Sequence, residues 1–245
     1  MRVGLLAVVL AASLAPASPA AAARCKKGFV KKHGTCVKAP VRKRPPVPAP
    51  PPPPANPPNL GQNLVQNPGA ESGTGSPTGT DVLPIPAWTT TGTMTAIAYQ
   101  PVESFPTTAI ATQIGGGANF FAGGPGTAAS TATQTIDLAA DAALVDARLA
   151  SATLAGYLGG WEDQEDAATV DATYLSATGA AVGTLTIGPV TRANRQSLTT
   201  LLLRTATAAV PAGTRAVQIT ITATRQAGPY NDGYADNVAF TLRRA

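Results

Sequence analysis

Histidine, cysteine and aromatic residues are scarce in this sequence. The single histidine is His33, close to the N-terminus, so residues 59–245 contain none. A Ser-His-Asp or Cys-His catalytic arrangement is therefore excluded from that part of the chain. The glycine runs at 115–117 and 123–126 lack the Lys and Ser/Thr of a phosphate-binding loop. These absences favour a protein that is not an enzyme.

The two cysteines, Cys25 and Cys36, stand in one short basic segment. Ten residues separate them, and residues 32–35 offer a turn between them. In an exported protein this spacing predicts a disulfide that closes a small hairpin. A metal site is less favoured, because two cysteines and one histidine leave a coordination position unfilled.

Positive charge is concentrated near the N-terminus, where acidic residues are absent. Residues 24–58 carry nine Lys or Arg and no Asp or Glu. Residues 59–245 carry eight Arg, no Lys and thirteen acids, which gives them a net charge of −5. A nucleic-acid-binding domain needs a basic surface of its own, so this distribution excludes nucleic acid as a partner of the domain. The N-terminal cations suit an anionic surface polymer or a membrane surface.

The sequence lacks an apolar run long enough to span a bilayer. The apolar stretch at residues 3–14 follows a basic start and precedes the small residues 21–23. This order predicts a signal peptide over residues 1–23 and a mature chain, beginning at Arg24, that has no transmembrane segment. A lipoprotein anchor on Cys25 is the alternative, but the arginine directly before it argues against this. We therefore expect a secreted, extracellular protein associated with the cell surface or cell wall.

Composition divides the mature chain into three parts. Residues 24–38 form a basic Cys-bounded segment, which we call the knob. We expect it either to adhere to an anionic surface polymer or to be a solvated handle with a stabilising disulfide. Residues 39–58 are rich in proline and predict an extended linker in the polyproline II conformation. Residues 59–245 are long enough to form one domain with a sizeable core.

The pattern of residues 59–245 indicates many short β-strands. In residues 216–224 apolar positions alternate with Gln or Thr, and residues 168–174 alternate in the same way. This period of two predicts strands with one buried face, and the last strand should direct Val238, Phe240 and Leu242 inward. Such strands separated by turns predict a sandwich or a barrel. Further strands are expected at 64–66, 93–99, 119–122, 132–138, 150–158 and 184–187, and helical turns at 141–145 and near 192–197.

The two ends of this part of the chain resemble a known family. Residues 63–71 read Asn-Leu-Val-Gln-Asn-Pro-Gly-Ala-Glu and are followed by Trp88, and residues 235–238 read Ala-Asp-Asn-Val. Together they resemble the galactose-binding-like jelly-roll domains, which include many carbohydrate-binding modules of secreted bacterial enzymes. Ala70 departs from the pattern, because many relatives have a large aromatic there. The resemblance implies an all-β jelly-roll β-sandwich of about eight or nine strands, preceded by the disulfide hairpin and the Pro-rich linker.

The resemblance also implies a structural calcium ion between the first and last strands. By analogy, Glu71 and Asp236 would supply carboxylate oxygens, and nearby backbone carbonyls would complete the shell. Calcium takes six to eight oxygen ligands, many of them from the main chain, so this chemistry fits. The alternative is that Glu71 caps a turn and Asp236 accepts hydrogen bonds from backbone amides.

Two polar segments are candidates for contact with a sugar. The acidic loop at 159–166 contains Trp161, which could stack on a sugar ring, and carboxylates that could accept hydroxyl hydrogen bonds. The segment 230–234 combines two tyrosines with an amide and a carboxylate. The alternatives are a solvated acidic turn with Trp161 over the edge of the core, and a turn that leads into the last strand. The candidate carbohydrate-binding residues are Trp161, Glu162, Asp163, Gln164, Asp166, Arg195, Tyr230, Asn231, Asp232 and Tyr234.

Three hypotheses for function follow from these observations. The first is a secreted, non-catalytic protein that binds a polysaccharide or cell-wall glycan. The second is a structural or adhesive surface protein that has no sugar site and is tethered by its basic knob. The third is a glycan-active enzyme that uses paired carboxylates, but the acids at 162–166 are too many to single out such a pair. Exposed aromatic rings in the two candidate segments would favour the first hypothesis, and buried rings would count against it.

Overall fold

The structure is a computed structural model that describes residues 24–39, 59–100 and 105–245. The predicted signal peptide (1–23) and all but the first residue of the predicted linker (39–58) lie outside the described residues. The chain divides into two compact units, and each is described here by itself.

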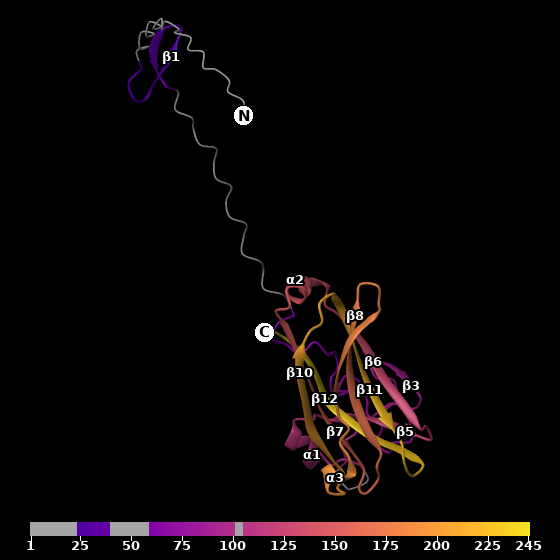
Figure 1. Cartoon of the computed structure of the whole chain (residues 1–245). Helices are drawn as coiled ribbons and strands as arrows, with labels where there is room; N and C mark the ends of the chain where they lie inside the picture. The colour runs from indigo at the N-terminus through magenta and orange to yellow at the C-terminus, as the bar shows by residue number, and fades with distance from the viewer. Residues whose placement is uncertain (1–23, 40–58, 101–104) are drawn as a thin grey trace, which may run out of the picture. The chain divides into compact units, whose positions relative to one another are not determined.

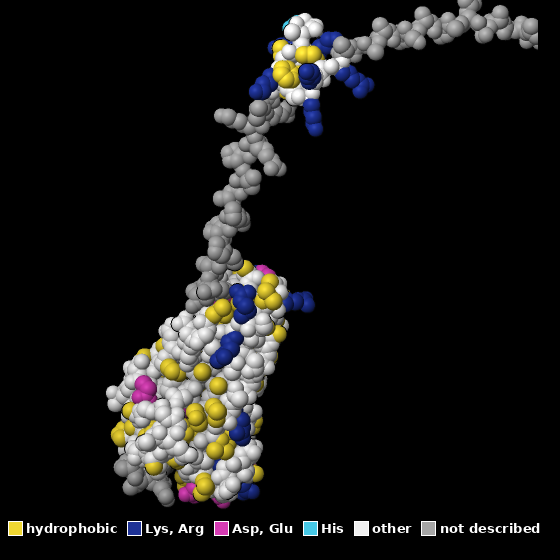
Figure 2. Space-filling view, turned by 90° about the vertical axis from the view of Figure 1, so that its left-hand side faces the viewer, with side chains coloured by type: hydrophobic (Ala, Val, Ile, Leu, Met, Phe, Trp, Pro, Cys, Tyr) yellow, Lys and Arg dark blue, Asp and Glu magenta, His cyan; other side chains and the backbone are white. Residues whose placement is uncertain are grey.

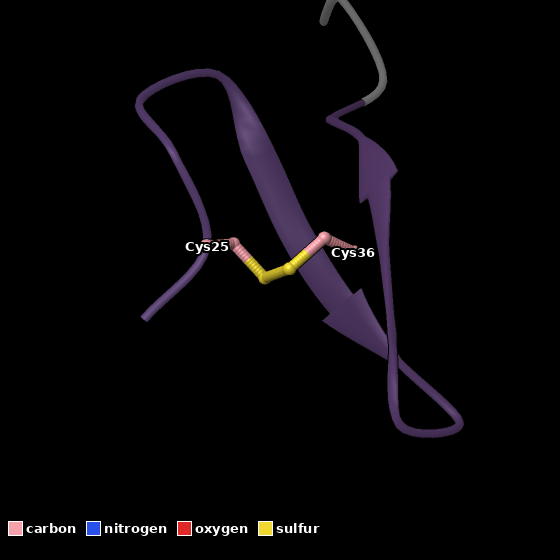
Figure 3. The surroundings of a disulfide bond; sticks show 2 residues. All are labelled: Cys25 and Cys36. Atoms are coloured by element: carbon pink, nitrogen blue, oxygen red, sulfur yellow. A yellow bond between two sulfur atoms is a disulfide. The ribbon is translucent and has the colours of Figure 1, made fainter. Parts of the chain in front are cut away.

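The knob is a small antiparallel hairpin of β1 (Phe29–Lys32) and β2 (Thr35–Lys38). Its two-residue turn is formed by His33 and Gly34, which both have positive φ, as a tight hairpin of this twist requires. A disulfide joins Cys25 to Cys36, as the cysteine spacing predicts (Figure 3). All eight strand residues are exposed, so the disulfide and the backbone pairing hold the hairpin without an apolar core.

The second unit is a jelly-roll sandwich of two five-stranded antiparallel sheets (Figure 1). The first sheet has the strand order β10-β7-β12-β5-β4, and the second has the order β3-β6-β11-β8-β9. This confirms the predicted all-β sandwich. The strands are β3 (Thr89–Thr91), β4 (Thr95–Ala98), β5 (Asn119–Pro125), β6 (Ala129–Asp137), β7 (Ala150–Gly160), β8 (Ala167–Ser176), β9 (Ala181–Ile187), β10 (Thr200–Ala209), β11 (Thr214–Thr224) and β12 (Tyr230–Arg244).

Alternating side chains build the core between the two sheets. In β11 the apolar residues Val217, Ile219 and Ile221 are buried, while the Gln and Thr residues between them are half-buried on the outer face. Tyr174 of β8 packs across the core against Phe240 of β12, with ring centroids 6.2 Å apart. Burial of this apolar surface is the main source of stability of the sandwich.

A second apolar cluster covers part of the outer face of the first sheet. It contains Leu201 of β10, Phe120 of β5 and Tyr234 of β12, which point away from the main core. Phe105 and the helix α1 (Thr108–Ile114) lie over them. The cluster therefore attaches the segment around α1 to the sheet.

The helices are short, and neighbouring capping residues fix where two of them begin or end. Thr107 caps the start of α1 by accepting a hydrogen bond from the Ile110 N–H, and Gly115 ends it in the left-handed conformation. Thr191 and Asn194 form a capping box at α3 (Arg192–Arg195). The other helices are a 3₁₀ turn (Ala139–Asp141) and α2 (Ala142–Asp146). None of the described helices has the length and apolar character needed to cross a membrane.

The opening segment of the domain completes the pairing of β12. This strand pairs with β5 only as far as Ala235, so its later backbone groups need other partners on that side. Leu64 N donates to Phe240 O (2.9 Å), and Val238 N donates to Pro68 O (3.0 Å). The first and last segments of the domain therefore run side by side, as the resemblance implies.

The strand prediction fails at three places. Residues 64–66 are not a strand, because the segment makes single bridges and loop hydrogen bonds beside β12 instead of a continuous ladder. The strands β3 and β10 have no predicted counterpart, so the sandwich has ten strands instead of eight or nine. In β10 the alternation is obscured, since Leu201, Leu202 and Leu203 are consecutive and only Leu203 is exposed.

The burial pattern predicts which truncations destabilise the sandwich. Phe240→Ala should lower the free energy of unfolding by about 3–5 kcal/mol, because it leaves a cavity beneath Tyr174. Leu203→Ala, at a site that is 51% exposed, should cost less than about 1 kcal/mol. Urea unfolding of both variants measures the difference, and equal losses would contradict the assigned core.

Candidate functional site

A groove lies on the outer side of the first sheet, beside α1. Its volume is about 480 Å³. Three separate parts of the chain form it: the start of α1, the acidic loop between β7 and β8, and the turn that leads into β10. The lining residues are Phe105, Thr107, Ile110, Glu162, Asp163, Ser197, Leu198, Thr199 and Thr200.

The lining of the groove combines apolar and hydroxyl-bearing side chains with two carboxylates. Glu162 and Asp163 are exposed, and Leu198 is 60% exposed. Figure 2 looks at the side on which β10 and α1 lie in Figure 1, where hydrophobic side chains form small separate patches. Six of the nine lining residues carry a hydroxyl or carboxyl group and three are apolar, a mixture that suits a sugar or another small molecule.

The buried guanidinium of Arg195 holds two walls of the groove. The Arg195 side chain is only 1% exposed, so a ligand at the surface cannot contact it. Its Nη1 donates to Glu162 O (2.8 Å) and Leu198 O (2.7 Å), and its Nη2 donates to Gln164 O (2.8 Å). These carbonyls point inward, while the side chains of Glu162, Asp163 and Glu165 are exposed. Arg195 therefore positions the groove and does not line it.

Asp166, the last residue of the acidic loop, binds the backbone of a neighbouring segment. It is fully buried, and its carboxylate accepts hydrogen bonds from three backbone N–H groups: those of Gln226 (2.6 Å), Ala227 (3.0 Å) and Asp232 (3.0 Å). A carboxylate is well suited to this task because it can accept several bonds at once. Asp166 thus joins the acidic loop to the connection between β11 and β12.

The polar segment 230–234 lies inside β12 and is not a turn. Asn231 and Tyr234 flank an irregularity in the pairing with β5, where the turn-forming residues make a bulge. Tyr234 is fully buried and donates a hydrogen bond to Asp232. Asn231 Nδ2 donates to Ala223 O (3.0 Å). The half-buried Tyr230 packs against Phe105, with ring centroids 5.6 Å apart.

The predicted carbohydrate-binding residues therefore divide into two groups. Glu162 and Asp163 line the groove, and the half-buried Trp161 and Tyr230 pack against the outer apolar cluster. The half-buried Gln164 lies beside Gly228 instead. The other five are buried and bonded internally, so the direct sugar contact predicted for them is corrected to an internal role. These five are Asp166, Arg195, Asn231, Asp232 and Tyr234. Long-range pairing, which the local sequence does not reveal, decides their burial.

Of the two arginines of α3, only Arg192 forms an ion pair with the acidic loop. Its Nε lies 3.4 Å from Glu165 Oε1, at an exposed site where an ion pair contributes little. Arg195 bonds to loop carbonyls instead of carboxylates. The sequence reasoning also missed the contribution of α1, whose signal was the capping Thr107 and the closing Gly115.

The carboxyl groups of Glu71 and Asp236 lie close together. Both Glu71 Oε1 and Asp236 Oδ1 are within 3.6 Å of the point that a β-carbon on Gly69 would occupy. Backbone N–H groups of Ala118 and Asn119 each donate to one oxygen of Glu71 (2.9 Å). The turn-capping role that was the alternative to calcium therefore has direct hydrogen-bond support.

Asp236 is a buried carboxyl group beside a second carboxylate. Burial and the nearby Glu71 raise the pKa of Asp236 to about 7. Its oxygens accept hydrogen bonds from the Tyr99 hydroxyl and the Asn237 N–H (both 2.6 Å). Neither carboxyl group forms an ion pair with a basic side chain among the described residues. Among the described residues, the two carboxyl groups are therefore stabilised by hydrogen bonds and not by a basic side chain.

The residues present fit a calcium ion only if the main chain takes part. Within the described ranges, no group of three or more His, Cys, Asp or Glu side chains is placed to hold a metal. Two carboxylates are available, however, and each oxygen keeps a free lone pair after its hydrogen bond. Gly69, Gly116 and Gly117 border these oxygens, so the backbone approaches them closely. Calcium accepts such a shell of carboxylate and carbonyl oxygens.

Comparison with known proteins gives a general likeness of fold. No family model and no curated protein matches the chain. It is similar to the enzymatically active domain of bacteriophage CBA120 tailspike protein 4 (19% identity, TM-score 0.44, 74% of this chain and 21% of that one). It is also similar to the CBM22-1 xylan-binding domain of Paenibacillus barcinonensis Xyn10C (11% identity, TM-score 0.41, 76% of this chain and 98% of that one).

A third similar structure holds the CBM22-1 and GH10 modules of Clostridium thermocellum endo-1,4-beta-D-xylanase 10B (12% identity, TM-score 0.39, 64% of this chain and 26% of that one). The chain thus spans about a quarter or less of the tailspike and xylanase chains. At these identities and TM-scores the likeness supports no conclusion about a shared activity.

The buried Asp232 should make stability depend on pH. Burial and the negative charge of Asp166 raise the pKa of Asp232 to about 6. The hydrogen bond from Tyr234 and the positive charge of Arg195 lower this pKa and offset part of the effect. The folded state therefore holds a proton that the unfolded state releases near pH 4, and stability falls as the pH rises through about 6. Between pH 4 and pH 7, titration of Asp232 should lower the free energy of unfolding by on the order of 1–3 kcal/mol.

Asp232→Asn tests this, because the amide keeps the shape and removes the titration. The melting midpoint of the variant, relative to the unsubstituted chain, should rise steadily from pH 4 to pH 7. A difference between the two proteins that is constant over this range would show that Asp232 does not titrate as described.

Proposed function

We propose that the chain is a secreted, non-catalytic protein whose β-sandwich binds a polysaccharide or cell-wall glycan in the groove beside α1. The observation that supports it most is the composition of the groove. Phe105, Ile110 and Leu198 provide an apolar floor for the C–H face of a sugar ring. Glu162 and Asp163 stand at the rim, where exposed carboxylates can accept hydrogen bonds from sugar hydroxyls.

Preorganisation also favours this groove over other parts of the surface. Arg195 fixes the backbone of two walls, and Asp166 fixes the far end of the acidic loop. A rigid site loses little conformational entropy when a ligand binds, so a modest number of contacts is enough for useful affinity.

A structural calcium ion between Glu71 and Asp236 is part of this proposal. It would neutralise the two carboxylates and stabilise the junction between the opening segment and β12. The groove lining includes neither carboxyl group, so we assign the ion to stability and not to the recognition of sugar.

The second candidate function is a structural or adhesive surface protein without a sugar site. The burial of Tyr234 and the half-burial of Trp161 and Tyr230 favour it, because buried rings offer no exposed platform for stacking. On this hypothesis the groove is a surface irregularity, and adhesion depends on the basic knob and its affinity for an anionic surface polymer.

A glycan array with residues 59–245 separates the two candidates. The double variant Glu162→Gln/Asp163→Asn should lower affinity for the bound glycan by about tenfold or more, equivalent to about 1.4 kcal/mol. The matched control is Glu165→Gln, which removes an exposed charge from the same loop outside the groove lining and should change affinity less than about twofold.

A separate variant, Trp161→Ala, should also weaken glycan binding. Its melting curve shows whether the domain remains folded. Absence of any bound glycan, or equal affinity in all variants, would favour the adhesive candidate over a sugar site.

Calcium binding is tested by melting the domain with excess calcium and with EDTA. A ligand at about a hundred times its Kd adds about 2.7 kcal/mol, which for a domain of this size corresponds to a midpoint about 5–10 °C higher in calcium. Glu71→Gln should remove most of that difference, while Glu165→Gln should keep it. Identical midpoints with calcium and with EDTA would exclude the ion.

A further inference from the structure

The knob presents its cations without any acidic neighbour. Residues 24–39 carry six Lys or Arg and no Asp or Glu. None of the six takes part in an ion pair among the described residues, because both ion pairs lie in the sandwich. In Figure 2 the basic side chains project from the knob around a small centre of hydrophobic atoms. This uncompensated charge favours an anionic partner.

The register of the hairpin places lysines on both of its faces. Residues paired across the strands share a face, and neighbours along a strand alternate between faces. The valine face combines the pair Val30–Val37 with Lys32. The disulfide face combines Phe29 with Lys31 and Lys38. The apolar and basic side chains are therefore mixed on each face and not separated.

This mixing decides between two kinds of anionic partner. An element that lies on a bilayer keeps its apolar and basic side chains on opposite faces, so that one face enters the lipid. The knob has no such face, although Phe29, Val30 and Val37 are each about half exposed. A flexible, linear polyanion can instead contact cations on both faces of a small hairpin.

The disulfide side offers the most basic surface. A hollow of about 330 Å³ is lined by Arg24, Lys26 and Phe29 together with the disulfide. Lys31 and Lys38 lie on the same face of the hairpin. Two cations thus line the hollow and two more lie on the same face of the hairpin. The disulfide (Figure 3) keeps the N-terminal segment in place beside the strands.

We propose that the knob binds linear polyanions with a phosphate-containing backbone, and that it does so independently of the glycan groove. The binding is electrostatic: it neutralises successive phosphate charges and releases their counterions. It therefore weakens steeply with salt.

Long-chain inorganic polyphosphate is the probe, titrated into the protein as secreted by an expressing host, with the N-terminus of the product verified by mass. The triple variant Lys31→Gln/Lys32→Gln/Lys38→Gln should bind at least about tenfold more weakly in low salt. The matched control Arg148→Gln/Arg243→Gln/Arg244→Gln removes three exposed cations from the sandwich and should change affinity less than about twofold. Absence of free thiols in each variant shows that the hairpin disulfide is intact.

Vesicles of phosphatidylcholine, with and without phosphatidylglycerol, test the other partner. The proposal expects weak vesicle binding that Val30→Thr/Val37→Thr leaves unchanged. It is overturned if anionic vesicles bind while polyphosphate does not, if polyphosphate binds the triple variant and the control equally, or if nothing binds in low salt. The last result would identify the knob as a solvated handle. Each readout is independent of the glycan array, so failure of the groove leaves this result interpretable.

Discussion

The fold of the sandwich depends on the contact between its first segment and its last strand. β12 lies at the centre of the first sheet, and beyond Ala235 one of its sides has no strand partner. The segment that ends at Pro68 supplies the missing hydrogen bonds, and the Asn63 side chain adds two more, to Phe240 N and Val238 O. Without this contact a central strand would leave buried backbone groups unpaired, which is costly.

The same contact brings the two carboxyl groups together. Val238 N bonds to Pro68 O immediately before the turn that carries Glu71, so Asp236 and Glu71 face a common region. The backbone pairing creates an electrostatic conflict, because one carboxyl group is buried next to another with no basic partner among the described residues. Hydrogen bonds from the Tyr99 hydroxyl and from backbone N–H groups stabilise the pair, and the proposed calcium ion would neutralise it.

Buried polar groups of α3 and the acidic loop shape the candidate groove. Arg195 and Asp166 are among the least exposed polar residues of the domain, and both bind backbone atoms of loops. They make the acidic loop rigid and leave Glu162 and Asp163 free at the rim. The knob has the opposite character, since it has no core and all its strand residues are exposed. The two units thus offer different chemistry: a preorganised groove in an acidic domain, and an exposed basic surface.

The sequence by itself determined the features that depend on neighbouring residues. Alternation of apolar and polar residues located β7, β8 and β11, the cysteine spacing predicted the disulfide hairpin, and the terminal motifs predicted that Glu71 and Asp236 meet. The tertiary structure decided which polar side chains are buried. Asp166, Arg195, Asn231, Asp232 and Tyr234 read as surface chemistry in the sequence, yet they bind internal partners up to 104 residues away. Burial of a polar group depends on whether distant segments supply its hydrogen bonds, and a local pattern carries no information about such partners.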